Sequence, residues 1–378
     1  MTPSPPRAWA EVDLDALRHN LQVARDTGGQ KVMAVVKAGA YGHGLEEVAT
    51  ALEGEHIAFF GVANVGEARR LAAAGITTPI YLLGPCFDDE RAEVVANDWL
   101  PSLSSCAEAD QFHALANTVG KILDVHLTVD TGMGRGGFLP EQVPDALDHI
   151  ATLPALRVTG IGSHLPAADE DPEFTRAQFD TFDTIVEQAT AKSHIANRAS
   201  HLQIHLSNSA GLLAYQSRTT NLARPGLMLY GCSPLPEFQE KLRPVMTLKS
   251  RVSIVRELPA GHGISYGRTT ILSRPTKVAT IGIGYGDGYP RALSGHNPEV
   301  FINGQRCPLL GRVTMDQVMA DVTDLPACTT GDEVELFGPN IPVAEVAEKA
   351  NTIPWEIFTS ITPRVTRIHL HPEPAQTS

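Results

Sequence analysis

The chain of 378 residues has no block of basic residues, no basic-then-apolar leader and no apolar run long enough to span a bilayer. Its 30 Lys and Arg are outnumbered by 43 Asp and Glu, which gives a net charge of −13. Nucleic acids and anionic membrane surfaces attract basic proteins, so this balance disfavours both as partners. The absence of a leader and of a membrane span predicts a cytoplasmic protein.

Cysteine is scarce, and no metal or nucleotide signature is present. The five cysteines are scattered and odd in number, and no two have CxxC spacing, which disfavours a disulfide framework or a zinc site. His201 and His205 would share one face of a strand, but no third ligand is evident, so no metal is expected. There is neither a GxGxxG after the first strand nor a GxxxxGK[ST], which disfavours dinucleotide and P-loop sites.

The first part of the chain alternates helical and apolar segments regularly. Residues 13–27 carry an apolar stripe at helical spacing, which Asp13 can cap, and an apolar strand is predicted at 31–36. Seven further pairs of helix and strand follow, and the strands are apolar runs, as is typical when both sheet faces are covered. The pattern predicts an α/β fold with a (β/α)₈ TIM-like barrel over residues 1–236. A doubly wound sheet is the alternative, but eight units are many for one.

The pattern changes in the remaining residues, 237–378. Short alternating segments over 245–340 are separated by turns rich in Gly, Pro and Asp, which predicts mostly β structure. One helix, VAEVAEKAN, and one strand, RVTRIHL, are predicted to follow. The sequence therefore predicts a C-terminal mostly-β domain.

Catalytic side chains are expected where the barrel strands end, because active sites of such barrels lie there. The residues predicted at these ends are Lys37, Tyr41, His43, Thr128, Asp130, Arg135, His164, Asn208, Ser209 and Arg224. The segments SNSAG and RPG, around Ser209 and after Arg224, offer free backbone N–H groups that suit a phosphate. A lysine that faces a phosphate site across a barrel mouth suggests pyridoxal 5′-phosphate held as a Schiff base.

Taken singly, these residues have ordinary structural explanations. A lysine at a strand end is more often a solvated charge, and His205 is best explained as a satisfied core histidine. SNSAG alone is typical of any helix start. Only the order of these residues along one predicted barrel favours a cofactor site.

Ten segments of the chain, in order, resemble the alanine racemase family of pyridoxal-phosphate enzymes, which have an N-terminal barrel and a C-terminal β domain. They are AWAEVDLDALRHNL, AVVKAGAYGHG, VDTGMGRGG, NSAG, ARPGLMLYG, LRPVMTLKSRV, GISYGRT, IGIGYGDGYPR, NGQRCPLLGRVTMDQ and GDEVELFG. The resemblance implies racemisation of L- and D-alanine in a homodimer with shared active sites, supplying D-alanine for peptidoglycan.

The resemblance also implies roles for individual residues. Lys37 would hold the cofactor and act as the base on one face of the substrate, and the partner subunit's Tyr266 would act on the other. Arg224 would donate to the pyridine nitrogen, which then stays unprotonated because arginine cannot accept. Further cofactor contacts would come from Tyr41, His164, Ser209, Gly226 and Leu227. The substrate carboxylate would contact Arg135 and Met315. The corridor for the substrate would include Asp169, Tyr285, Arg291, Arg312 and Trp355.

The chain departs from the family pattern at four positions. Gly39 replaces an asparagine, Trp355 replaces a tyrosine, and Thr314 replaces a frequent cysteine. Thr128 stands where many members carry a carbamylated lysine that would orient Arg135, so we expect chloride or water there instead.

Three other functions stay open from the sequence. One is a broad-spectrum, serine or basic amino-acid racemase on the same scaffold. Another is a non-catalytic pyridoxal-phosphate carrier, which the second domain with GISYGRT disfavours. A decarboxylase of similar fold is disfavoured because such enzymes usually offer a carboxylate, not an arginine, to the pyridine nitrogen.

Overall fold

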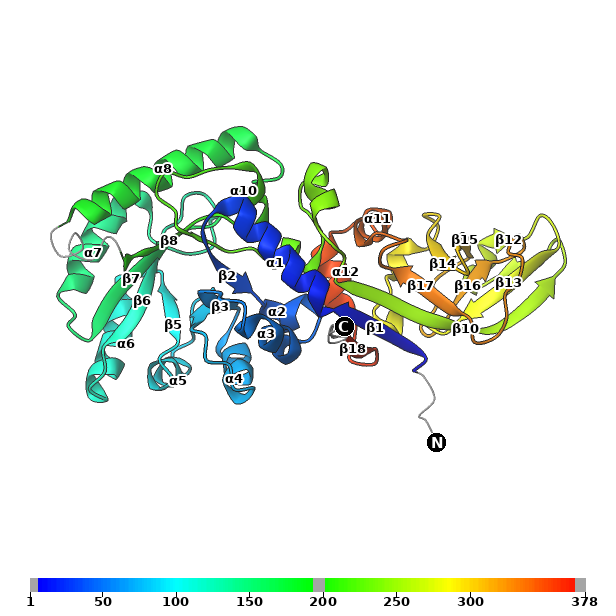
Figure 1. Ribbon diagram of the computed structural model, residues 1–378, viewed down its shortest axis with the longest axis horizontal. Coiled ribbons are helices and arrows are strands. Elements are labelled where there is room, and N and C mark those ends of the chain that lie inside the picture. The colour runs from blue at the N-terminus through cyan, green and yellow to red at the C-terminus, as the bar shows by residue number, and fades with distance from the viewer. Residues whose placement is uncertain (1–5, 193–200, 371–378) are drawn as a thin grey trace, which may run out of the picture.

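The computed structural model describes residues 6–192 and 201–370 (Figure 1). Residues 1 and 378, the outer limits of the two predicted domains, therefore lie outside the described residues. So do residues 2–5, which belong to the segment where the sequence predicts no leader. The molecule is elongated, with an α/β part at one end and a β-rich part at the other (Figure 1). Within the described ranges, no helix combines the length and apolar character needed to cross a bilayer.

Eight parallel strands form the sheet of the first part, in the order β8-β7-β6-β5-β4-β3-β2-β9. They are β2 (Lys31–Val35), β3 (Phe59–Val62), β4 (Ile80–Leu82), β5 (Leu100–Leu103), β6 (Leu123–Thr128), β7 (Leu156–Gly162), β8 (Gln203–His205) and β9 (Leu222–Ala223). Backbone hydrogen bonds from Asn221 N to Ile204 O (3.0 Å) and from Arg224 N to Ser207 O (2.9 Å) join the two ends of this sheet. The predicted barrel is confirmed.

Helices pack around the outside of the sheet (Figure 1). They are α1 (Leu14–Gly28), α3 (Leu45–Glu53), α4 (Val65–Ala73), α5 (Arg91–Ala96), α6 (Cys106–Thr118), α7 (Val143–Ala151), α8 (Pro172–Ala191) and α10 (Ser209–Ala214). The first follows the predicted pattern: Asp13 Oδ1 accepts from the N–H groups of Asp15 and Ala16, both at 2.9 Å, and Leu17 and Leu21 are fully buried. Capping and an apolar stripe thus position α1 on the barrel.

The second part is a closed β barrel. Its strands are β10 (Met246–Leu258), β13 (Thr276–Ile281), β14 (Glu299–Ile302), β15 (Gln305–Leu310), β16 (Val318–Asp321) and β17 (Glu333–Phe337), beside a small ribbon of β11 (Gly263–Ile264) and β12 (Thr270–Ile271). The order β13-β16-β15-β14-β17-β10 closes because β10 also pairs with β13. Asn303 and Gly304 join β14 to β15 with positive φ values of 48° and 86°, as a two-residue hairpin requires. The predicted mostly-β domain is confirmed.

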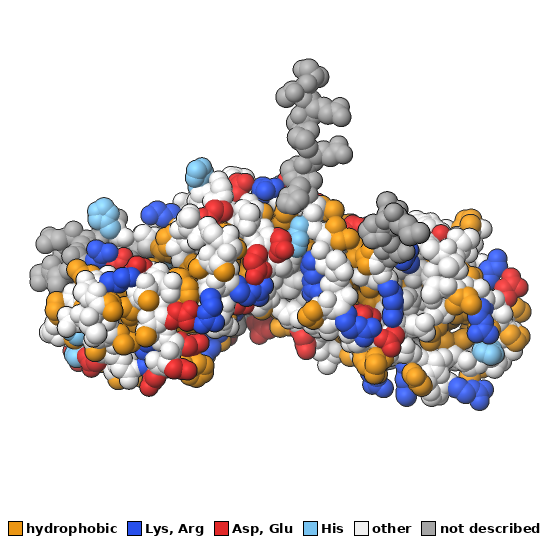
Figure 2. All heavy atoms as spheres, turned by 90° about the horizontal axis from the view of Figure 1, so that it is seen from below, with side chains coloured by type: hydrophobic (Ala, Val, Ile, Leu, Met, Phe, Trp, Pro, Cys, Tyr) orange, Lys and Arg blue, Asp and Glu red, His pale blue; other side chains and the backbone are white. Residues whose placement is uncertain are grey.

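Two elements link the parts. Strand β1 (Ala8–Asp13) precedes the α/β barrel in sequence but pairs with β10 and with β18 (Thr366–Leu370) in the second sheet. After α11 (Val343–Lys349), helix α12 (Pro354–Ser360), which the sequence did not predict, returns to the barrel, where Phe358 packs on His43 with ring centroids 4.9 Å apart. The division at residues 236 and 237 stays a prediction. On the face seen in Figure 2, acidic and basic side chains are interspersed over the α/β part of the molecule.

Candidate active site

Lys37 follows strand β2 and directly precedes a left-handed turn. The five residues 38–42, most of which lie in the segment labelled α2 (Lys37–Tyr41), all have φ between 54° and 79°. Residues with a Cβ occupy this region at a cost of about 1–2 kcal/mol each, so the turn depends on its hydrogen bonds. They include Ala40 N to Val36 O at 2.7 Å and Gly42 N to Ala38 O at 2.9 Å. The turn brings Lys37 and Tyr41 to the same cavity.

The turn gives a physical account of Gly39. This residue has a φ of 63°, and a Cβ built on it would meet no atom within 4 Å. Glycine occupies the left-handed region without strain, and asparagine tolerates it better than most residues. The departure from the family pattern therefore exchanges one residue suited to this conformation for another.

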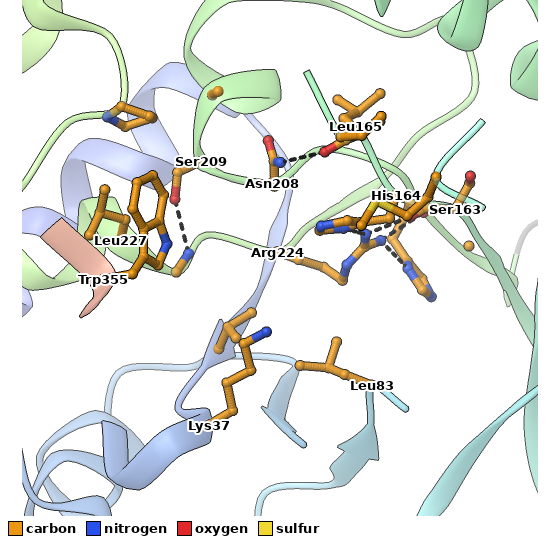
Figure 3. Close-up of a pocket in the computed structure, with 18 of the residues that line it drawn as sticks. Lys37, Leu83, Ser163, His164, Leu165, Asn208, Ser209, Arg224, Leu227 and Trp355 are labelled. Atoms are coloured by element: carbon orange, nitrogen blue, oxygen red, sulfur yellow. Dashed lines mark hydrogen bonds between the residues drawn. The ribbon is translucent and has the colours of Figure 1, made fainter. Parts of the chain in front are cut away.

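A cavity of about 370 Å³ lies at the carboxyl ends of the barrel strands. The predicted residues that line it are Lys37, Tyr41, Thr128, Arg135, His164, Asp169, Asn208, Ser209, Arg224, Gly226, Leu227 and Trp355. Figure 3 shows the Lys37 ammonium pointing into the cavity, with Arg224 on one side and Trp355, Leu227 and Ser209 on the other. Among the described residues, no group of three or more His, Cys, Asp or Glu side chains is suited to hold a metal ion.

One wall of the cavity forms a small cup. Ser209 Oγ accepts hydrogen bonds from the N–H groups of Gly226 (3.0 Å) and Met228 (3.3 Å). A Cβ at Gly226 would lie 2.4 Å from the Tyr41 hydroxyl, so only glycine lets this hydroxyl come so close to the backbone. Burial raises the pKa of Tyr41, which therefore remains a neutral donor. The hydroxyl groups of Ser209 and Tyr41 beside this backbone form a cup that suits a phosphate group.

Arg224 is buried and anchored through both terminal nitrogens. Nη1 donates to the backbone oxygen of His205 at 2.9 Å and also contacts His205 Nδ1. Nη2 donates to Ser163 O and contacts His164 Nδ1 at 3.2 Å (Figure 3). Its Nε–H makes no hydrogen bond with any described residue. Burial lowers the pKa of Arg224 to about 10, so it is still a cation at neutral pH. The side chain is a fixed donor at the cavity wall.

Behind Arg224, two histidines form a chain inside the barrel. Because arginine can only donate, His205 Nδ1 accepts from it, and the proton of His205 lies on Nε2, 2.9 Å from His126 Nδ1. Burial, and then the charge of Arg224, lowers the pKa of His126 to about 3, so it is neutral. The sequence did not single out His126, because a histidine within a strand carries no motif. His205 is buried as predicted, but it also holds Arg224.

The charge of Lys37 is set by burial and by its neighbours. Burial, followed by the positive charge of Arg135, lowers the pKa of Lys37, while Glu67 opposes this shift. A larger share of Lys37 is therefore neutral at neutral pH than for an exposed lysine. The neutral amine is the form that adds to a carbonyl and accepts a proton.

The other predicted residues do not line this cavity; they are His43 and Asp130 of the barrel, and Tyr266, Tyr285, Arg291, Arg312 and Met315. The last five belong to the second domain, where hydrogen bonds join the segments that carry several of them. Ser265 Oγ donates to Arg312 O at 2.7 Å, and Gly286 N donates to Met315 O at 2.8 Å. The side chains of Tyr266 and Met315 are 71% and 52% exposed.

The fold and the cavity define a two-domain barrel enzyme with a lysine and an arginine at its strand ends. Comparison with protein-family models matches residues 12–234 to the alanine racemase N-terminal domain and residues 245–369 to the alanine racemase C-terminal domain. The chain belongs to the alanine racemase family, which consists of pyridoxal-phosphate-dependent isomerases.

Curated relatives and solved structures agree with this assignment. The alanine racemase of Methylacidiphilum infernorum is 38% identical over 375 residues, covering 98% of this chain and 94% of that protein. The alanine racemase of Clostridium difficile 630 superposes with a TM-score of 0.88 at 32% identity, covering 97% of this chain and 96% of that one. The enzyme from Bartonella henselae, solved with covalently bound pyridoxal phosphate, has a TM-score of 0.87 at 30% identity, covering 97% and 100%.

Proposed function

We propose that the chain interconverts L- and D-alanine with pyridoxal 5′-phosphate bound covalently to Lys37. The main evidence is that one cavity is lined by Lys37, whose pKa is lowered, by Arg224, which can only donate, and by the cup at Gly226. The cup would hold the phosphate through Ser209, Tyr41 and the backbone of Gly226 and Leu227. The close approach of the Tyr41 hydroxyl to Gly226, which a Cβ would prevent, supports this fit.

The residues around the cavity divide the chemistry between them. When bound, pyridoxal phosphate draws in the electron pair that is left when the substrate Cα loses its proton. Arg224, steadied by His164, would face the ring nitrogen as a donor and leave it unprotonated, which restrains decarboxylation and transamination. Lys37 would remove or return the Cα proton on one face.

The second base would come from the partner subunit's Tyr266 in a homodimer with shared active sites. Tyr266 lies outside the cavity of its own chain and is largely exposed, which supports contact with another subunit. Residues 1–236 would then bind the cofactor, and 237–378 would complete the partner's site.

Substrate would reach the cavity through residues of both subunits. Arg135 and the backbone of Met315 would bind the carboxylate. The corridor would be lined by Asp169 and Trp355 of one chain and by Tyr285, Arg291 and Arg312 of the partner. The product D-alanine would supply peptidoglycan synthesis in the cytoplasm.

Racemisation assays on a panel of L-amino acids test the proposal. We expect kcat/KM to be highest for alanine and lower for serine, lysine and arginine. A preference for lysine or arginine would favour the basic amino-acid racemase instead. Lys37→Ala should abolish the visible absorbance of the attached cofactor. A chain that binds cofactor but racemises nothing would favour the carrier, and a Tyr266→Phe variant as fast as the wild type would exclude Tyr266 as the second base.

A further inference from the structure

Glu67 is a buried carboxylate, 9% exposed, in the first turn of α4. Its Oε2 accepts from Ala63 N at 2.9 Å, and Asn64 Oδ1 accepts from Glu67 N at 3.0 Å, so the two side chains cap the helix together. Its other oxygen, Oε1, accepts from the Gly39 N–H at 3.2 Å. That contact crosses to the neighbouring loop, which carries Lys37.

Glu108 in α6 is a comparable glutamate that caps its helix without a contact to the turn after Lys37. Its Oε2 accepts from Ser104 N at 2.8 Å, Ser105 Oγ accepts from Glu108 N at 3.2 Å, and the side chain is similarly buried at 6%. No hydrogen bond joins Glu108 to residues 37–44 in the part of the chain that the structure describes. The contact between Glu67 and Gly39 is therefore an addition to the cap.

The added contact falls near the start of the left-handed turn. Lys37 precedes the turn, Tyr41 lies near its end, and both line the cavity. A bond to the amide of Gly39 restrains the turn between them. Since left-handed backbone is costly for residues with a Cβ, a fixed acceptor here stabilises the conformation that sets the spacing of Lys37 and Tyr41.

We propose that Glu67 is a positioning residue: its carboxylate ties the turn to the start of α4 and places a negative charge near Lys37. The inference rests on the proposed cofactor attachment at Lys37 and deepens it. Burial and the charges of Arg135 and Arg224 lower the pKa of Lys37, and the charge of Glu67 is the one opposing contribution. Its removal should lower the pKa of Lys37 further.

Amide hydrogen exchange over residues 37–44 tests the positioning role without relying on activity. In Glu67→Ala, the Gly39 amide loses its acceptor, and exchange in this segment should become about tenfold faster, as expected for loss of a bond to a charged group. Glu108→Ala is the matched control, because it removes a comparable cap from α6. It should leave exchange in this segment as in the wild type.

A second measurement follows the attachment of added pyridoxal phosphate to the cofactor-depleted protein as a function of pH. Glu67→Ala should slow attachment about fivefold or more, since misplacing one reacting group strongly reduces rates. Glu67→Gln keeps the length and one acceptor oxygen of the side chain, so we expect this variant to fold. It lacks the negative charge. Its pH profile should move to lower pH than that of the wild type, whereas Glu108→Ala should match the wild type.

The outcomes separate the two proposals. Unchanged exchange in Glu67→Ala, or an equal increase in Glu108→Ala, would overturn the positioning role. If Glu67→Ala does not fold, the pH profile of Glu67→Gln decides, and a profile identical to the wild type overturns the role. If the wild-type protein does not attach the cofactor at Lys37, the proposed function fails, while the exchange result still decides whether Glu67 holds the turn.

Discussion

The Nε2 atom of His205 lies 2.9 Å from the Nδ1 atom of His126 inside the α/β barrel. Because Arg224 only donates, the bond between the two histidines can have one direction, from His205 to His126. Both imidazoles must therefore be neutral, each with its proton on Nε2. Arg224 is held by a chain of hydrogen bonds that extends into the barrel interior.

Replacing His126 should show how much this chain contributes to stability. His126→Leu leaves the buried Nε2–H of His205 without an acceptor and should lower the free energy of unfolding by about 1–3 kcal/mol. His126→Asn can still accept through its amide oxygen and should lose less. Urea denaturation measures both. A leucine variant as stable as the wild type would contradict the directed chain.

The buried histidines also predict a loss of stability in acid. Burial lowers the pKa of His126 and of His164 to about 3 from the ordinary value of 6.5. As the pH falls from about 6.5 to about 3, the unfolded chain binds protons that the folded chain does not, so the free energy of unfolding falls. The slope is up to about 1.4 kcal/mol per pH unit for each such histidine. Urea titrations should show a correspondingly shallower slope for His126→Asn, and an unchanged slope would refute the assignment.

The left-handed turn predicts an order of tolerance at Gly39. Gly39→Ala should lower the free energy of unfolding by about 1–2 kcal/mol through backbone strain, because its Cβ meets no neighbour. Gly39→Asn should cost less, since asparagine tolerates this conformation. Equilibrium unfolding of the two variants measures the difference. An asparagine variant less stable than the alanine variant would mean that side-chain contacts, not strain, dominate.

Mixing two inactive variants tests the shared active site. Lys37→Ala and Tyr266→Phe homodimers should both be nearly inactive. When the two are unfolded and refolded together in equal amounts, half of the dimers should be mixed, and each should contain one intact site. Racemisation should then return to about a quarter of the wild-type rate. Continued inactivity of the refolded mixture would place Tyr266 in the site of its own chain, and an active Tyr266→Phe homodimer would place it outside the mechanism.

The neighbourhood of Thr128 predicts an anion or water beside Arg135. Both residues line a second cavity of about 180 Å³ with Ser102 and Ser104, and Arg135 makes no hydrogen bond or ion pair with a described residue. Threonine cannot supply the charge of a carbamylated lysine, so chloride or water should bridge to the guanidinium. A crystal structure from bromide solution should show anomalous density for an ion or ordinary density for a water. Clear density for a fixed Arg135 with neither would exclude this expectation.

Local patterns in the sequence were sufficient to predict the folds of the two parts and most of the residues that line the cavity. Apolar runs predicted the parallel strands, the stripe and the cap of Asp13 predicted α1, and turn residues predicted the β domain. The strand-end rule placed Lys37, Ser209 and Arg224 at one mouth. Each of these signals depends on neighbouring residues or on a motif of fixed order, so no tertiary information is needed.

Only the path of the chain in space decided the rest. Gly39 and Glu67 are 28 residues apart, and His126 and His205 are 79 apart, yet each pair is hydrogen-bonded. Strand β1 and helix α12 likewise find their partners on the other part of the molecule. A glutamate in a helix and a histidine in a strand are common. The roles of Glu67 and His126 depend on the loop and the side chain that folding brings next to them. Sequence periodicity specifies which face of an element is buried, but not which distant polar group meets it there.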